Sequence, residues 1–154
     1  MTAAPTPRSQ LPPRLLPVLY FALAHIAFAL ACLAVALDPR GVSGFFYHSR
    51  MLAIVHLVTL GWITASILGS LYIVGPVALR VTFPATRTAY LAFALVVIGI
   101  VGMVAHFWLN EYGGMAWSGG TVGTGIVIAG GAIARRLAKA TLPARSLRTS
   151  CSHL

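Results

Sequence analysis

The stretch LAIVHLVTLGWITASILGSLYIVGPVAL, residues 52–79, is apolar throughout and holds one histidine, His56, but no acid, lysine or arginine. It exceeds the roughly 20 residues that an α-helix needs to cross about 30 Å of hydrocarbon. Three further apolar stretches lie at about Leu15–Leu37, Ala89–Leu109 and Ala116–Ala134. The sequence therefore predicts an all-α fold, a four-helix transmembrane bundle in contact with the lipid bilayer.

The composition indicates the same class of protein. Hydrophobic residues make up 58% of the chain and charged residues only 8%, against roughly 25% charged residues in soluble domains. Four spans use most of the 154 residues, which leaves no room for a folded soluble domain. We expect a disordered cytoplasmic arm at 1–14, because it is rich in proline and lacks a helical period. A four-span membrane domain at 15–136 and a basic cytoplasmic tail at 137–154 should follow.

The positively charged residues concentrate on one side of the predicted spans. Only Arg40 and Arg50, of the 11 lysines and arginines, fall in the loop between the first two spans. The other side of the membrane receives the rest, namely Arg8, Arg14, Arg80, Arg87, Arg135, Arg136, Lys139, Arg145 and Arg148. The positive-inside rule then places both termini in the cytoplasm, and we expect a multi-pass protein of a bacterial inner membrane. The net charge of +9 is thereby explained without nucleic-acid binding.

Small residues recur at helical spacing on two spans. Gly61, Ala65 and Gly69 stand at i, i+4 and i+8, and Gly119 and Gly123 form a similar pair on the fourth span. Small residues at this spacing let the backbones of two membrane helices approach closely. At 100° per residue, the first stripe is centred about 180° from His56. The second span should therefore pack on one side and present its histidine on the other.

Three histidines lie within predicted spans, where an ionisable residue is a functional candidate by default. At 1.5 Å per residue, His56 lies roughly 9 Å, His106 roughly 6 Å and His25 roughly 16 Å below the ends of their helices. His56 and His106 thus have similar depth on adjacent helices, as two axial ligands of a haem iron would. A wetted interfacial position for His106 and a hydrogen bond to a neighbouring helix for His25 are the simpler alternatives. A site for a bare metal ion is disfavoured, because none of these histidines has a second ligand at i+3 or i+4.

Arg50, His56, Gly61 and the ending ILGSLYIVGPV, residues 67–77, together resemble the second transmembrane helix of the haem-copper oxidase subunit I superfamily. The similarity is to distant members, of the cytochrome-c-linked or nitric-oxide-response branch, and covers only the N-terminal part of such proteins. The resemblance implies that His56 is an axial ligand of a haem, for which we expect haem b. The later helices that hold the family's second haem ligand and its copper have no counterpart in this sequence.

The sequence predicts a membrane haem protein that transfers electrons or senses a ligand in respiration and does not reduce oxygen alone. Whether it is an enzyme stays open, and a homodimer or other respiratory subunits are the expected protein partners. One alternative is a non-enzymatic membrane module that helps assemble a respiratory complex. Another is a truncated fragment of a twelve-helix oxidase-like protein. A transporter is disfavoured because no span holds an acid, a lysine or an arginine to couple an ion.

Overall fold

The computed structural model describes residues 14–44, 47–79 and 85–150. The described residues form helices and contain no strand. The elements are α1 (Leu15–Leu37), α2 (Pro39–Val42), α3 (Ser49–His56), the π-helix η2 (Leu57–Thr64), α4 (Ala65–Leu79), α5 (Arg87–Leu109) and α6 (Met115–Ser150). Since α3, η2 and α4 follow one another without a break, they make one span. Within the described part of the chain, four helices are long and apolar enough to cross a membrane, which confirms the predicted all-α transmembrane bundle.

The third span shows how the sequence sets the ends of a helix. Thr86 is extended, and its side chain accepts a hydrogen bond from the Ala89 N–H at 3.2 Å, which caps the start of α5. At the other end Asn110 adopts a left-handed conformation with φ of 59°, a common way for a helix to stop. The Glu111 N–H then donates back to the His106 carbonyl at 2.9 Å. The chain thereby turns at once into α6.

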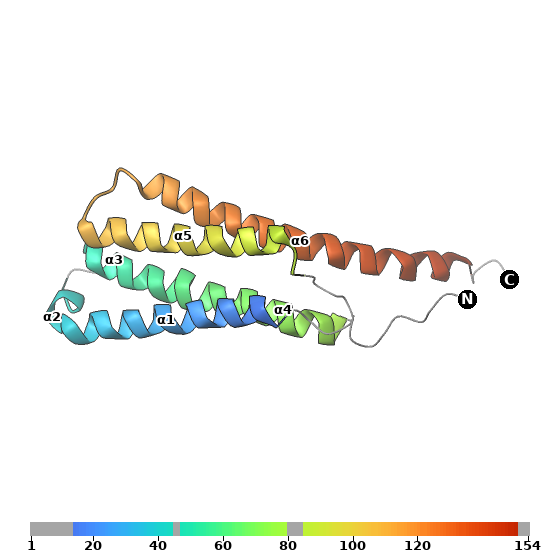
Figure 1. Ribbon diagram of the computed structural model, residues 1–154, viewed down its shortest axis with the longest axis horizontal. Helices are drawn as coiled ribbons and strands as arrows, with labels where there is room; N and C mark the ends of the chain where they lie inside the picture. Colours follow the sequence, from blue (N-terminus) through green and yellow to red (C-terminus); the bar gives the residue numbers. More distant parts are fainter. Residues whose placement is uncertain (1–13, 45–46, 80–84, 151–154) are drawn as a thin grey trace.

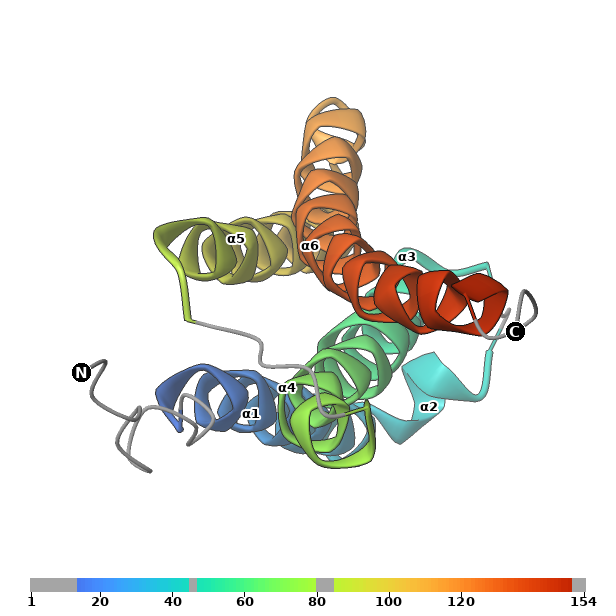
Figure 2. The same ribbon diagram turned by 90° about the vertical axis from the view of Figure 1, so that its right-hand side faces the viewer.

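The helices form two hairpins that lie side by side (Figures 1 and 2). In one hairpin α1 packs along η2 and α4, and in the other α5 packs along α6. The main contact between the hairpins is that of α3 with α5, whereas α6 packs chiefly on α5. We call the end at which α1 and α5 finish and α3 and α6 begin the loop end.

The core of the bundle is built from apolar and aromatic side chains. Tyr20 of α1 is fully buried, with Phe93 edge-on at 4.9 Å between ring centroids and Tyr72 stacked at 6.0 Å. A smaller cluster nearer the loop end contains Ala27 and Leu57. Other large apolar side chains face outward, with exposed fractions such as 61% for Ile98 and 72% for Val127, both on predicted spans. Outward apolar surface of this kind suits contact with lipid.

Close helix contacts depend on glycines in both hairpins. A Cβ on Gly61 would lie 2.5 Å from the Cβ of Ala27, and one on Gly69 would lie 3.1 Å from the Cβ of Tyr20. The predicted stripe on the second span therefore lies against α1. Between α5 and α6, a Cβ on Gly99 would overlap Val122, whereas Gly123 has open space at this position. The second hairpin is thus closest at Gly99, and of the expected pair Gly119 lies against α5, with a Cβ 3.4 Å from Met103, whereas Gly123 does not.

The second span differs from a plain α-helix in two respects. Its turns widen to a π-helix over Leu57–Thr64, so the uniform 100° rotation used to relate His56 to the glycine stripe does not apply there. The helix also continues through Pro76 to Leu79, although a proline inside a helix kinks or breaks it. Helix α6 runs to Ser150, and the part of it that is apolar enough to cross a membrane is Met115–Arg136. Of the expected arm and tail, residues 1–13 and 151–154 lie outside the described residues.

Candidate functional site

His56 is the last residue of α3, immediately before the π-helix. Its Nδ1 lies 2.6 Å from the Leu52 carbonyl oxygen. Because a carbonyl oxygen only accepts, Nδ1 carries a proton, and in the neutral imidazole Nε2 then keeps its lone pair. The ring is half-buried and lies 4.7 Å from the ring of Phe107, tilted by 33°. A histidine that donates its Nδ1–H to a backbone carbonyl has the tautomer of many metal-ligating histidines, which bind through Nε2.

His106 occupies a different face of α5 from the one that meets α3. Its ring lies against Gly114, where a Cβ would overlap the imidazole. His56 instead contacts Phe107, the next residue along α5. Successive helical residues point about 100° apart, so the two imidazoles share a depth but not a face. The structure therefore does not bring His56 and His106 together as a facing pair within one chain.

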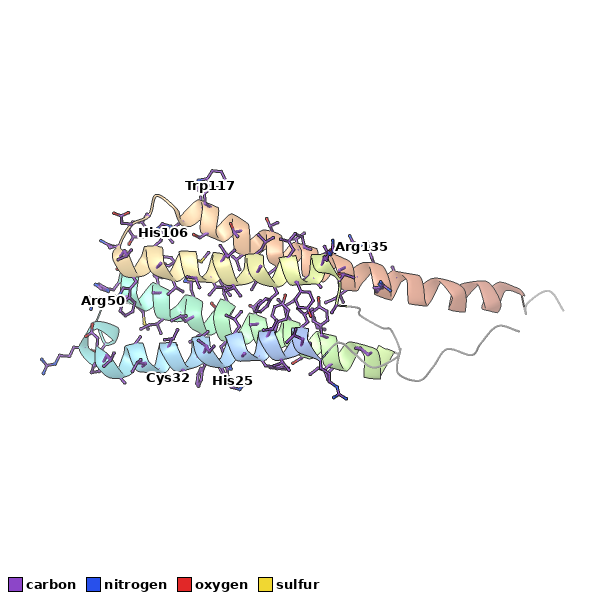
Figure 3. All side chains as sticks on the ribbon, in the orientation of Figure 1. His25, Cys32, Arg50, His106, Trp117 and Arg135 are labelled. Carbon is purple, nitrogen blue, oxygen red and sulfur yellow. The ribbon has the colours of Figure 1, made fainter. Side chains whose placement is uncertain are left out.

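His25 lies on the outer surface of α1. It is exposed, and its Nδ1 lies 2.7 Å from the Phe21 carbonyl oxygen of its own helix. Figure 3 shows His25 beside α1 on one side of the molecule and His106 beside α5 and α6 on the other. Its hydrogen bond is thus within its own helix, and not to a neighbouring helix. His25 offers no second ligand near His56.

The described residues can supply one axial ligand to a haem iron, but not two. His56 has the required tautomer, and no hydrogen bond to its Nε2 is present within residues 14–44, 47–79 and 85–150. His106 and His25 face elsewhere, as described above. Within the same described part there is no group of three histidine, cysteine or acidic side chains that would hold a metal ion. Among the described residues, neither His106 nor His25 is placed to serve as a second ligand to an iron on His56.

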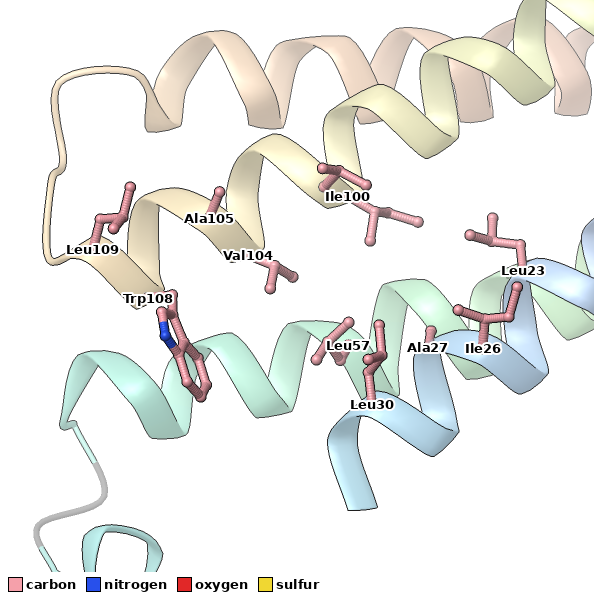
Figure 4. A pocket seen from close by; sticks show the side chains of 11 residues that line it. Leu23, Ile26, Ala27, Leu30, Leu57, Ile100, Val104, Ala105, Trp108 and Leu109 are labelled. Atoms are coloured by element: carbon pink, nitrogen blue, oxygen red, sulfur yellow. The ribbon is translucent and has the colours of Figure 1, made fainter. Parts of the chain in front are cut away.

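An apolar groove opens between α1 and α5 at the loop end (Figure 4). Its volume is about 440 Å³, and its wall includes Leu57, the neighbour of His56, but not His56 itself. All of its lining side chains are apolar or aromatic, namely Leu23, Ile26, Ala27, Leu30, Leu57, Ile100, Val101, Val104, Ala105, Trp108 and Leu109. The groove offers a place for a hydrocarbon group and no hydrogen-bonding partner along most of its length.

A polar pocket of about 720 Å³ adjoins the groove, and Trp108 lines both. There the guanidinium of Arg50 donates to the Asp38 carboxylate at 2.9 Å, with both side chains substantially exposed. The same guanidinium lies 5.7 Å from the centre of the Trp108 ring, in a cation–π arrangement. Sequence reasoning missed this pocket, although Arg50 and Asp38 flank the loop between the first two spans. The signal that could have revealed the pocket was the presence of charged residues and a tryptophan at the same membrane interface.

From its depth alone, His106 was expected to lie beside His56. Nothing in the sequence indicated that Phe107 would lie there instead. Both residues lie in an unbroken apolar helix, and only the contact of α3 with α5 decides which one faces inward. No protein-family model matches the chain, and comparisons with curated proteins and with solved structures give no match.

Proposed function

We propose that this multi-pass membrane protein binds a b-type haem through His56 and transfers electrons or senses a ligand in respiration, without reducing oxygen alone. The observation that carries the proposal is the hydrogen bond from Nδ1 of His56 to the Leu52 carbonyl at 2.6 Å, which leaves Nε2 with its lone pair. The resemblance of residues 50–77 to a haem-ligand helix supports the same role. We place the protein in a bacterial inner membrane with both termini in the cytoplasm, following its distribution of positive charge.

The residues around His56 define what this chain contributes to such a site. Leu52 orients the imidazole and fixes its tautomer. Phe107 covers one side of the ring, which limits its rotation and excludes water from that side. Haem, when bound, supplies a centre for one-electron transfer or for binding a small ligand.

The second axial ligand, where there is one, would be supplied by a second copy of this chain or by another respiratory subunit. His106 is turned towards Gly114 and His25 is exposed on α1, so neither supplies it from within. Two copies that each contribute His56 would account for a bis-histidine site. The proposal therefore links haem binding to assembly.

Visible spectra of the purified protein and its histidine variants test the proposal. Replacing His56 with alanine should abolish the haem absorbance while helical circular dichroism stays unchanged. His25→Ala is the matched control, because His25 makes the same kind of hydrogen bond but is exposed on α1. A wild-type protein that purifies colourless from haem-replete cells and takes up no added haemin would contradict haem binding. Loss of the low-spin spectrum in His106→Ala would contradict the assignment of the second ligand to another chain.

A membrane assembly module is the second candidate, and uncovered surface on α6 favours it. Gly120 and Gly130 have open space where a Cβ would stand, and Thr124 between them is exposed. Small exposed residues along one membrane helix permit the close approach of another helix. A colourless protein that co-purifies with respiratory subunits, and loses them in Gly120→Leu, would support this function over haem binding.

A further inference from the structure

The apolar groove and the polar pocket form one continuous surface at the loop end. Trp108 belongs to both, so the hydrocarbon-lined part ends where the charged part begins. From Ile100 to Trp108 the groove follows α5 for about 12 Å at 1.5 Å per residue. The order along the helix is thus apolar towards the middle of the span and polar at its end, which matches the orientation of a lipid in a bilayer.

The polar pocket is rich in hydrogen-bond donors. The guanidinium of Arg50 has five N–H groups, and the bond to Asp38 that the structure shows uses one of its nitrogens, NH1, at 2.9 Å. Nδ1 of His48 accepts from the Arg50 backbone N–H at 3.4 Å, which leaves the proton of a neutral imidazole on Nε2. Tyr112 donates to the amide oxygen of Asn110 at 2.9 Å, which leaves the amide N–H groups of Asn110. The Asp38 carboxylate already offsets the charge of Arg50, so what the pocket still offers is hydrogen-bond donors, and a group with several acceptor oxygens complements them.

We propose that the groove and the pocket together bind one membrane phospholipid. One acyl chain lies in the groove between α1 and α5, and the phosphate accepts hydrogen bonds beside Arg50. The phosphate supplies the acceptor oxygens and the negative charge that a bidentate guanidinium prefers. The site does not depend on a haem at His56.

Two features of the structure distinguish this site from general contact with lipid. The groove is a hollow between two helices, with the buried side chains of Ala27 and Leu57 in its wall. The Arg50 guanidinium is held at the mouth of this hollow by both Asp38 and the Trp108 ring.

Native mass spectrometry of the full chain in detergent, with added palmitoyl-oleoyl-phosphatidylethanolamine, tests the site. The wild type should retain one such lipid. Ala105→Phe, which fills the groove, should abolish retention. Arg50→Gln should weaken it by at least about tenfold, the order expected when a charge-assisted hydrogen bond is lost.

Matched variants control for general effects on the membrane surface. Ala29→Phe enlarges an exposed alanine of α1 outside the groove, and Arg40→Gln removes a loop arginine outside the pocket. Both should bind the phospholipid as the wild type does. Diacylglycerol with the same two chains lacks the phosphate and should bind at least about tenfold more weakly.

Several results would overturn the proposal. Equal retention in Arg50→Gln and wild type would show that the pocket does not hold the phosphate. Equal binding of diacylglycerol and the phospholipid to the wild type would also show that the pocket does not hold the phosphate. This comparison needs no variant, so a folding defect in Arg50→Gln cannot affect it. A lipid-free dimer that Ala105→Phe converts to monomer would show that a second copy, and not a phospholipid, covers the groove.

Discussion

Replacing Gly61 with alanine should destabilise the protein, because the new methyl group meets the methyl group of Ala27. The two carbons would stand 2.5 Å apart, whereas carbon atoms prefer a separation of about 3.5–4.0 Å. The two helices must therefore separate by about 1 Å or more. Overpacking of this kind costs about 1–3 kcal/mol, and the better helix propensity of alanine offsets at most about 1 kcal/mol. We expect a net loss of roughly 1–2 kcal/mol, measured by unfolding in detergent.

A double-mutant cycle isolates this contact from other effects. Combining Gly61→Ala with Ala27→Gly leaves one methyl group at the crossing, so stability should recover by about 1 kcal/mol relative to the sum of the single changes. Gly123→Ala is the matched control, since open space surrounds that position, and it should be neutral or slightly stabilising. If Gly61→Ala is as stable as Gly123→Ala, η2 and α1 do not approach as described, and the reasoning is refuted.

Three further predictions concern other parts of the molecule. Tyr20→Phe should stabilise the protein by about 1 kcal/mol, because no hydrogen-bond partner for the buried Tyr20 hydroxyl is present among the described residues; lower stability in thermal unfolding would contradict this. Gly114→Ala should displace the His106 ring it overlaps, visible in the imidazole NMR signals, and leave any haem absorbance intact. Reporter fusions after Leu79 and at the carboxyl terminus should both read cytoplasmic, and an external signal at either position would refute the topology.

Hydropathy alone predicted the four spans, because crossing a membrane fixes both the length and the composition of a helix. The first span was placed at Leu15–Leu37, where α1 lies. The π-helix was not predicted, because α and π turns both accept the same apolar residues. The π-helix changes the rotation per residue. The helix face of a residue beyond Leu57 therefore cannot be worked out from His56 with a constant angle of 100° per residue.

The candidate site was predictable in depth but not in direction. Counting residues from helix ends placed His56 and His106 at similar heights, since the rise per residue is nearly constant. Which face of α5 meets α3 depends on packing between the two hairpins, and there Phe107 contacts His56. The polar pocket likewise joins Arg50 and Asp38, which flank one loop, to Trp108, which lies far away in the chain and which only the folded bundle brings beside them.

The π-helix also affects how the second span tolerates insertions and deletions. A π turn closes its hydrogen bond at i+5 and therefore contains one residue more than an α turn. Removing a residue from an ordinary stretch of α-helix rotates everything after it by about 100°, which would turn Gly69 away from α1. Removing one residue within Leu57–Thr64 instead lets a wide turn revert to an α turn. His56 and the α1-facing surface of α4 then keep their relative phase, so this segment should tolerate a one-residue deletion that an α-helical stretch would not.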